Sequence, residues 1–137
     1  MGRTARVLVV DDEEAVRHVL LRWLRGWGYE AAAVAGATEA LEAMAARPAD
    51  ILVADLTMPL HNGIWLLEQV HRQWPSTLII VESGAQEFGT ILKAKAQGAM
   101  AFIPKPIERE LLHQAVSRAA TEVTRPAERA SGAEQER

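Results

Sequence analysis

The chain contains no cysteine among its 137 residues. This absence excludes disulfide bonds and thiolate metal sites, and it fits a reducing compartment. The chain also lacks a strong charge of either sign, because 15 basic and 18 acidic residues give a formal net charge of -3. A chain with this balance has no broad basic surface for phosphate backbones, so we do not expect it to bind nucleic acid directly.

No long apolar segment occurs near the N-terminus either. The apolar run that begins after Arg6 is interrupted by Asp11, which makes it too short for a signal peptide or a membrane span. We therefore expect a soluble, cytoplasmic protein without membrane contact. The hydrophobic content of 49% is nevertheless enough for a chain of this length to bury one core.

Five short apolar runs have the composition of β-strands. Most of them are continuous aliphatic runs, which are typical of strands covered on both faces of a sheet. The run 30–34 is rich in alanine and poor in β-branched residues, so we place it at an edge of the sheet. The predicted strands are residues 6–10, 30–34, 50–56, 77–81 and 100–103.

Between these strands, apolar residues recur at the spacing of one face of an α-helix. The five stripes are Val16, Val19, Leu20, Trp23, Leu24 and Trp27; Ala37, Ala40, Leu41, Met44 and Ala45; Ile64, Leu67, Val70 and Trp74; Phe88, Ile91, Leu92 and Ala96; and Leu111, Leu112, Ala115, Val116 and Ala119. The residues that end the first four helices are Gly26, Pro48, Pro75 and Gly98. We expect the tryptophans of these stripes to lie in the core or at its partly buried rim.

Strands and helices thus alternate five times with short connections. This alternation predicts a parallel sheet between two layers of helices, joined by right-handed crossovers. The expected architecture is a doubly wound α/β fold in three layers, formed by a single domain over residues 1–121. The polar segment 122–137 offers little to bury, so we expect a disordered tail or the start of a linker.

In such a sheet, the carboxyl ends of all strands meet at one edge. The polar residues delivered to this edge are Asp11, Asp12, Asp55, Ser83 and Lys105. Two carboxylates about 4 Å apart repel by roughly 4 kcal/mol at an effective dielectric constant near 20, so the edge needs a cation. Oxygen ligands without cysteine or paired histidines favour Mg²⁺. A nucleophilic carboxylate, a metal, an ammonium group and a hydroxyl together can make and hold an acyl phosphate.

Four segments together resemble the receiver domain of two-component response regulators. They are residues 7–13 (VLVVDDE), residues 55–63 (DLTMPLHNG), the pair Ser83-Gly84 and residues 102–106 (FIPKP), within a match from about Arg6 to Thr121. The resemblance implies a five-stranded sheet of order 2-1-3-4-5 with five helices. It also implies a signalling domain and not an enzyme, apart from its own phosphotransfer and slow autodephosphorylation.

The resemblance assigns a role to each candidate site residue. Asp55 accepts a phosphoryl group from a phosphohistidine of a sensor histidine kinase or phosphotransfer protein, which makes it 4-aspartylphosphate. The implied Mg²⁺ ligands are Asp11, Asp12, Asp55 and the backbone carbonyl of Thr57. Asp12 is the more direct ligand of the first pair, and the Met58-Pro59 turn presents the carbonyl. Lys105 contacts the phosphoryl group, and the Lys105-Pro106 bond is expected to be cis.

Signal output is implied to depend on Ser83 and Phe102. When Ser83 moves toward the phosphoryl group, it leaves space for Phe102 to turn inward. The surface of the fourth helix, fifth strand and fifth helix then changes. That surface signals to an effector protein or an output domain, and homodimerisation stays open.

Several positions depart from the family pattern. The switch hydroxyl is Ser83 instead of the commoner threonine, and Glu82 stands where apolar residues are usual. We expect Glu82 to add negative charge near the output surface. Thr57 and Ala85 occupy positions that tune acyl phosphate hydrolysis in this family. Met100-Ala101 replaces an acidic pair, so the charged dimer interface of winged-helix regulators is not predicted.

Other interpretations fit parts of the pattern. The fold can serve as a protein-binding module without phosphorylation, although the complete acidic set argues against it. A haloacid dehalogenase-type hydrolase shares the sheet and the metal, but its nucleophile ends the first strand and it carries a cap domain. Residue by residue, Asp11 and Asp12 can be helix caps, Ser83 a turn residue and Phe102 plain core. The four histidines lack ligand spacing, and we assign no role to His61 in the loop after the third strand.

Overall fold

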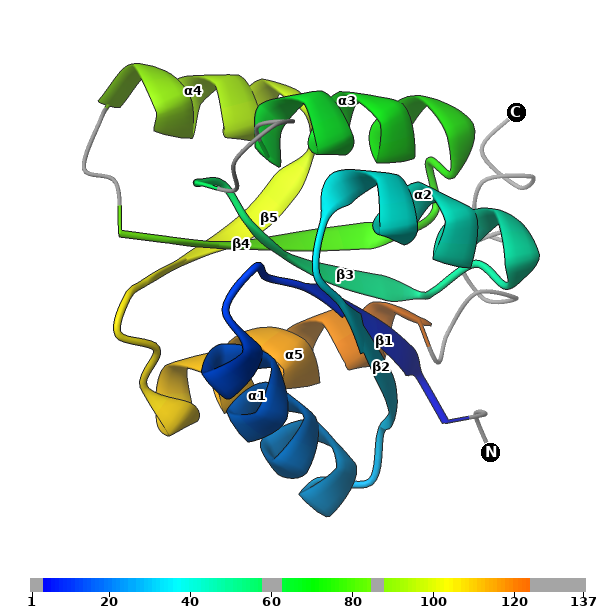
Figure 1. The fold of residues 1–137 in the computed structure, drawn as a ribbon, viewed down its shortest axis with the longest axis vertical. Helices are drawn as coiled ribbons and strands as arrows, with labels where there is room; N and C mark the ends of the chain where they lie inside the picture. Colours follow the sequence, from blue (N-terminus) through cyan, green and yellow to red (C-terminus); the bar gives the residue numbers. More distant parts are fainter. Residues whose placement is uncertain (1–3, 58–62, 85–87, 124–137) are drawn as a thin grey trace, which may run out of the picture.

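The computed structural model of the chain describes residues 4–57, 63–84 and 88–123. In these ranges five strands alternate with five helices (Figure 1). The strands are β1 (Arg6–Val10), β2 (Glu30–Val34), β3 (Ile51–Asp55), β4 (Leu78–Ser83) and β5 (Ala99–Pro104). The helices are α1 (Glu14–Gly26), α2 (Ala37–Ala46), α3 (Gly63–Gln73), α4 (Phe88–Ala96) and α5 (Arg109–Val123). Within the described ranges, none of the helices combines the length and the apolar character that a membrane span requires.

The strands form one sheet in the order β2-β1-β3-β4-β5, and every neighbouring pair is parallel. This confirms the predicted order and the edge position of the Ala-rich strand β2. Helices α1 and α5 cover one face of the sheet, and α2, α3 and α4 cover the other (Figure 1). The predicted three-layer α/β fold is therefore confirmed.

Each face of the sheet carries its own hydrophobic cluster. All five residues of β3 are buried, as expected for a central strand with helices on both sides. Successive residues of β3 alternate between the clusters, so that Val53 packs on the α1/α5 face and Ala54 on the α2/α3/α4 face. This alternation decides which way each side chain at the carboxyl edge points.

Three aliphatic residues that the helical stripes placed in the core lie at the surface instead. Val19, Leu92 and Leu111 keep 43%, 50% and 39% of their surface exposed. The small side chains Ala45 and Ala96 are exposed too. Val19 and Leu111 lie at a border of their stripes, whereas in α4 the buried residue is Ala94, which the predicted stripe did not include.

The tryptophans of the stripes lie where they were expected. Trp23 and Trp27 are half-buried against the α1/α5 cluster, and Trp74 is half-buried against the opposite cluster. The observed strands differ from the predicted ones only at their ends. Strand β3 is shorter than the predicted 50–56, whereas β4 and β5 extend to Ser83 and Pro104.

Candidate functional site

Strand alternation places the candidate residues on two opposite faces at the carboxyl edge of the sheet. Asp55 ends β3 and is in register with Glu82 of β4. Both side chains lie on the α1/α5 face, since residues in register on parallel strands share a face and Ile80 belongs to that cluster. Phe102 packs on the other face, against the α2/α3/α4 cluster. The site therefore has a charged side and an apolar side.

Lys105 lies at the centre of a polar pocket on the α1/α5 face. Its ammonium nitrogen is 3.0 Å from Asp55 Oδ2, 3.3 Å from Asp11 Oδ2, 3.3 Å from Glu13 Oε1 and 3.7 Å from Glu82 Oε1. Asp11, Asp55 and Glu82 are buried, at 0%, 1% and 0% exposed, whereas Glu13 is exposed. Buried carboxylates are tolerated when they are paired, so Lys105 compensates this cluster. We call Asp11, Asp55, Glu82 and Lys105 the acidic pocket.

Asp55 is held on both of its carboxylate oxygens. The backbone N–H and the hydroxyl of Thr57 donate to Oδ1 at 2.9 and 2.8 Å, and Lys105 donates to Oδ2 at 3.0 Å. Helix α3 begins directly against this strand end. A Cβ atom at Gly63 would lie 2.5 Å from Leu56 Cα and 2.7 Å from the Asp55 carbonyl oxygen, so only glycine permits this approach.

The three predicted metal-ligating aspartates come together. Asp11, Asp12 and Asp55 each offer a carboxylate oxygen, and these oxygens lie within 4.8 Å of one another. Mg²⁺ in proteins is bound by few carboxylates and keeps several water ligands. Asp12 is exposed, so one side of this aspartate cluster is open to solvent. Helix capping does not account for this pair, because the N-cap of α1 is Glu13 and it has no side-chain cap. No histidine among the described residues belongs to a cluster that can hold a metal.

The prediction that Glu82 adds charge near the output surface is wrong. Its side chain is completely buried and lies in the acidic pocket, beside Asp11 and Lys105. The signal was present in the sequence, since Glu82 follows Ile80 by two and therefore shares its face. What the sequence does not contain is the register with β3, which brings Glu82 alongside Asp55.

Burial and neighbouring charges shift the pKa of several pocket groups. Burial, and next the contact with Asp11, raises the pKa of Glu82 to about 10. Burial opposes the charge of Asp11, but hydrogen bonds from Glu82 and the Glu13 N–H, with the charge of Lys105, hold its pKa below the ordinary value. Burial also opposes the charge of Lys105, but Asp55, Asp11 and Glu82 raise its pKa. A proton on one Glu82 oxygen lets that oxygen donate to Asp11 Oδ2, which otherwise has no hydrogen-bond partner among the described residues.

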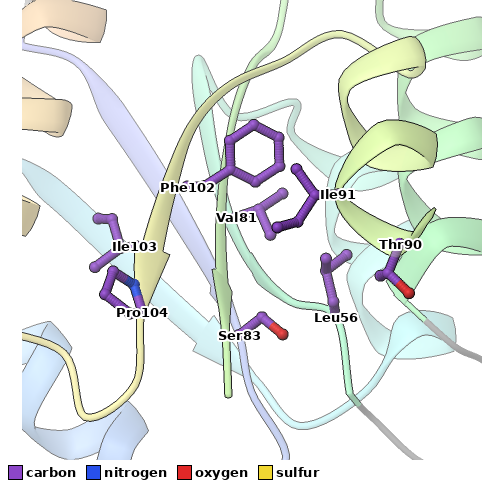
Figure 2. A pocket seen from close by; sticks show the side chains of 8 residues that line it. All are labelled: Leu56, Val81, Ser83, Thr90, Ile91, Phe102, Ile103 and Pro104. Carbon is purple, nitrogen blue, oxygen red and sulfur yellow. The ribbon is translucent and has the colours of Figure 1, made fainter. Parts of the chain in front are cut away.

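The apolar side of the site contains a cavity of about 180 Å³ (Figure 2). Its lining residues are Leu56, Val81, Ser83, Thr90, Ile91, Phe102, Ile103 and Pro104. Figure 2 shows the half-buried ring of Phe102 beside Val81 and Ile91, with Ser83 at the far end of the cavity. The cavity is partly open to solvent, and the two predicted switch residues share its space, in which a side chain can move.

Other predictions have separate outcomes. The Lys105-Pro106 peptide bond is cis, as the resemblance implied. Helix α5 runs to Val123, which is buried, and the rest of the predicted tail lies outside the described residues. The Met58-Pro59 turn, His61 and Ala85 also lie outside them. The carbonyl of Thr57 as a metal ligand stays a prediction.

Comparison with known sequences identifies relatives of the chain. The model of the response regulator receiver domain matches residues 7–117. The DNA-binding transcriptional regulator NtrC of Escherichia coli strain K12 is 34% identical over 102 residues, which cover 74% of this chain and 22% of NtrC. NtrC of Azospirillum brasilense is 33% identical over 123 residues, covering 90% of this chain and 26% of that protein. The chain thus spans about a quarter of the length of these relatives.

Solved structures agree with this assignment. The signal receiver domain of an HD domain-containing protein from Pseudomonas fluorescens Pf-5 matches with a TM-score of 0.84 and 29% identity, covering 88% of this chain and 98% of that chain. NtrX from Brucella abortus matches with a TM-score of 0.85 and 27% identity, covering 94% of this chain and 29% of that chain. The resemblance of the four sequence segments is confirmed. The chain belongs to the response regulator receiver domain family of two-component systems.

Proposed function

We propose that this receiver accepts a phosphoryl group on Asp55 in a Mg²⁺-dependent reaction. The observation that supports this most strongly is the placement of Asp55. It is 1% exposed, lies 3.0 Å from Lys105 and shares a 4.8 Å cluster of oxygens with Asp11 and Asp12. Receiver domains typically bind Mg²⁺ at such an aspartate cluster. The proposed donor is a phosphohistidine of a sensor histidine kinase or a phosphotransfer protein.

The proposed reaction is a displacement at phosphorus. A carboxylate oxygen of Asp55 attacks the phosphorus atom, and the P–N bond to the donor imidazole breaks as the new O–P bond forms. The electron pair of the broken bond stays on the imidazole, which takes up a proton. The groups that would hold Mg²⁺ are Asp11, Asp12, Asp55 and the carbonyl of Thr57, and the ion supplies positive charge for the phosphoryl oxygens. Lys105 and the hydroxyl of Ser83 donate hydrogen bonds to the same oxygens.

The proposed output is a change on the apolar side of the site. Ser83 lines one end of the cavity and Phe102 the other, so a shift of Ser83 toward the phosphoryl group gives the ring room to turn inward. The surface formed by α4, β5 and α5 then changes its population of conformations. The proposed recipient is an effector protein or an output domain, which the residues after Val123 would join as a linker. The DNA binding named for the NtrC relatives is not assigned to this domain, and the proposed location is the cytoplasm.

Intact mass spectrometry with acetyl phosphate and Mg²⁺ tests the phosphoacceptor. Wild type is expected to gain one phosphoryl group, and chelation of the metal with EDTA is expected to prevent it. Asp55→Asn should gain none. The matched control is Asp50→Asn, because Asp50 directly precedes β3, at the end opposite to Asp55, and accepts a hydrogen bond from the Arg6 N–H. An unmodified wild type, or equal labelling of Asp55→Asn, contradicts the proposed function.

A further inference from the structure

Glu82 is the member of the acidic pocket that the proposed reaction does not use. Its side chain is 0% exposed, and among the described residues its two oxygens find no hydrogen-bond donor. Burying such a group costs free energy, and a strand position between two helical layers is ordinarily apolar. We therefore expect the buried carboxyl group of Glu82 to make a contact that an apolar residue cannot make.

The Glu82 carboxyl group contacts the ammonium group of Lys105. The ammonium nitrogen lies 3.7 Å from Glu82 Oε1, and its other carboxylate partners are Asp11, Asp55 and Glu13. In the proposed reaction the cation engages Asp11 and Asp55, and the phosphoryl group then occupies Asp55. The carboxylate of Glu13 is exposed to solvent, which weakens its pairing with Lys105. Glu82 is thus the buried partner that remains available throughout.

Strand β4 holds the backbone of Lys105 as well. The Lys105 N–H donates to the carbonyl oxygen of Ser83 at 3.1 Å, one residue after Glu82. The lysine is therefore tied to neighbouring residues of the same strand at both ends, by its backbone and by its ammonium group. A long side chain restrained at both ends loses its rotamer freedom before the phosphoryl group arrives.

We propose that Glu82 is a positioning residue that keeps the Lys105 ammonium in the pocket while Asp11 and Asp55 are engaged by the cation or the phosphoryl group. The proposal rests on the proposed function of Asp55. It predicts that Lys105 without Glu82 becomes more accessible once Mg²⁺ is bound. It also predicts that any effect of Glu82 on phosphorylation passes through Lys105.

The accessibility of Lys105 is measured by reductive methylation with formaldehyde and a borane, followed by peptide mass spectrometry. The lysines of the chain are Lys93, Lys95 and Lys105, and the first two are exposed on α4, so they serve as internal controls. In saturating Mg²⁺, Glu82→Met is expected to methylate Lys105 up to about fivefold faster than wild type, the loss expected for one contact at salt-bridge distance. Glu82→Gln keeps an oxygen acceptor of the same reach and is expected to stay near the wild-type rate.

Three results of the methylation measurement would overturn the proposal. A wild-type rate at Lys105 in Glu82→Met, or a Glu82→Gln rate equal to that of Glu82→Met, overturns the proposal. Faster methylation of Lys93 and Lys95 as well reports a general loosening of the fold and also overturns it. Glu82→Val, which suits a strand, replaces Glu82→Met if the latter does not fold. Since this measurement needs no phosphorylation, it stays informative even if Asp55 is never modified.

A double-mutant cycle tests the route of the effect. Phosphorylation by acetyl phosphate is expected to be about fivefold slower in Glu82→Met than in wild type. In the Lys105→Ala background the same substitution is expected to change the rate by less than about twofold, because the group that Glu82 positions is gone. An equal slowing in both backgrounds shows that Glu82 acts by another route and contradicts the proposal.

Discussion

The two sides of the carboxyl edge of the sheet differ in what they contain. On the α1/α5 side, three buried carboxyl groups surround one ammonium at contact distances of 3.0 to 3.7 Å. On the opposite side, Ser83 and Phe102 border an apolar cavity of about 180 Å³. The first side concentrates charge, and its charged groups contact one another. The second side contains unfilled space. In the proposed function, charge that arrives on the first side is converted into a movement of side chains on the second side, across the sheet.

The contribution of the acidic pocket to the free energy of unfolding is expected to depend strongly on pH. The folded-state pKa of Glu82 is raised to about 10, from 4.5 in its ordinary surroundings. Between these values the unfolded chain releases the proton and the folded chain keeps it, so the free energy of unfolding falls as the pH rises. The expected loss is about 1 kcal/mol per pH unit relative to Glu82→Gln, which has no such proton.

Urea denaturation of both proteins in EDTA from pH 5 to pH 9 measures this loss. The difference between the two free energies of unfolding isolates Glu82, because the other titrating groups are shared. A difference that does not change with pH would show that Glu82 is ionised in the folded chain, which contradicts a raised pKa in the acidic pocket.

The strand end that carries Asp55 is expected to tolerate no added atom. Gly63→Ala is predicted to lower the free energy of unfolding by about 2 kcal/mol, because its Cβ meets backbone atoms of Leu56 and Asp55 at 2.5 and 2.7 Å. The control is Gly89→Ala in α4, where a Cβ meets nothing within 4 Å and the expected change is a gain of about 0.5 kcal/mol. Equal effects of the two substitutions in chemical denaturation would contradict the close packing at Gly63.

A pair of conservative substitutions compares the packing of the two sides. Val81→Ile adds a methylene group beside the cavity and is predicted to leave the free energy of unfolding within about 0.5 kcal/mol of wild type. Val53→Ile adds the same group to the closely packed α1/α5 cluster, with an expected cost of about 1 kcal/mol. Thermal denaturation of both variants measures the difference. Equal costs would mean that the cavity offers no usable room.

Much of this arrangement could be predicted from the sequence. Short apolar runs, most of them aliphatic, located the five strands of the described residues, and the rule that parallel strands end at one edge brought Asp11, Asp12, Asp55 and Lys105 together. The placement of Glu82 could not be obtained in the same way, since it depends on the register between β3 and β4, which is set by packing across the sheet.

The exposed helix residues show a second limit. Periodicity identifies the apolar stripe of a helix, but the width of the buried part depends on how the helix lies on the sheet. Val19, Leu92 and Leu111 satisfy the helical spacing and still reach solvent. The cavity between Ser83 and Phe102 was likewise beyond prediction, because a void is a property of packed side chains and leaves no pattern in the chain.

Amide NMR spectra with Mg²⁺ and acetyl phosphate test whether charge in the acidic pocket controls the cavity on the other side of the sheet. In wild type, phosphorylation is expected to shift the amide signals of β5 around Phe102. Lys105→Ala is expected to retain some phosphorylation, measured by mass on the same sample, while those shifts disappear. Phosphorylation-dependent shifts around Phe102 that persist unchanged in Lys105→Ala would contradict the claim.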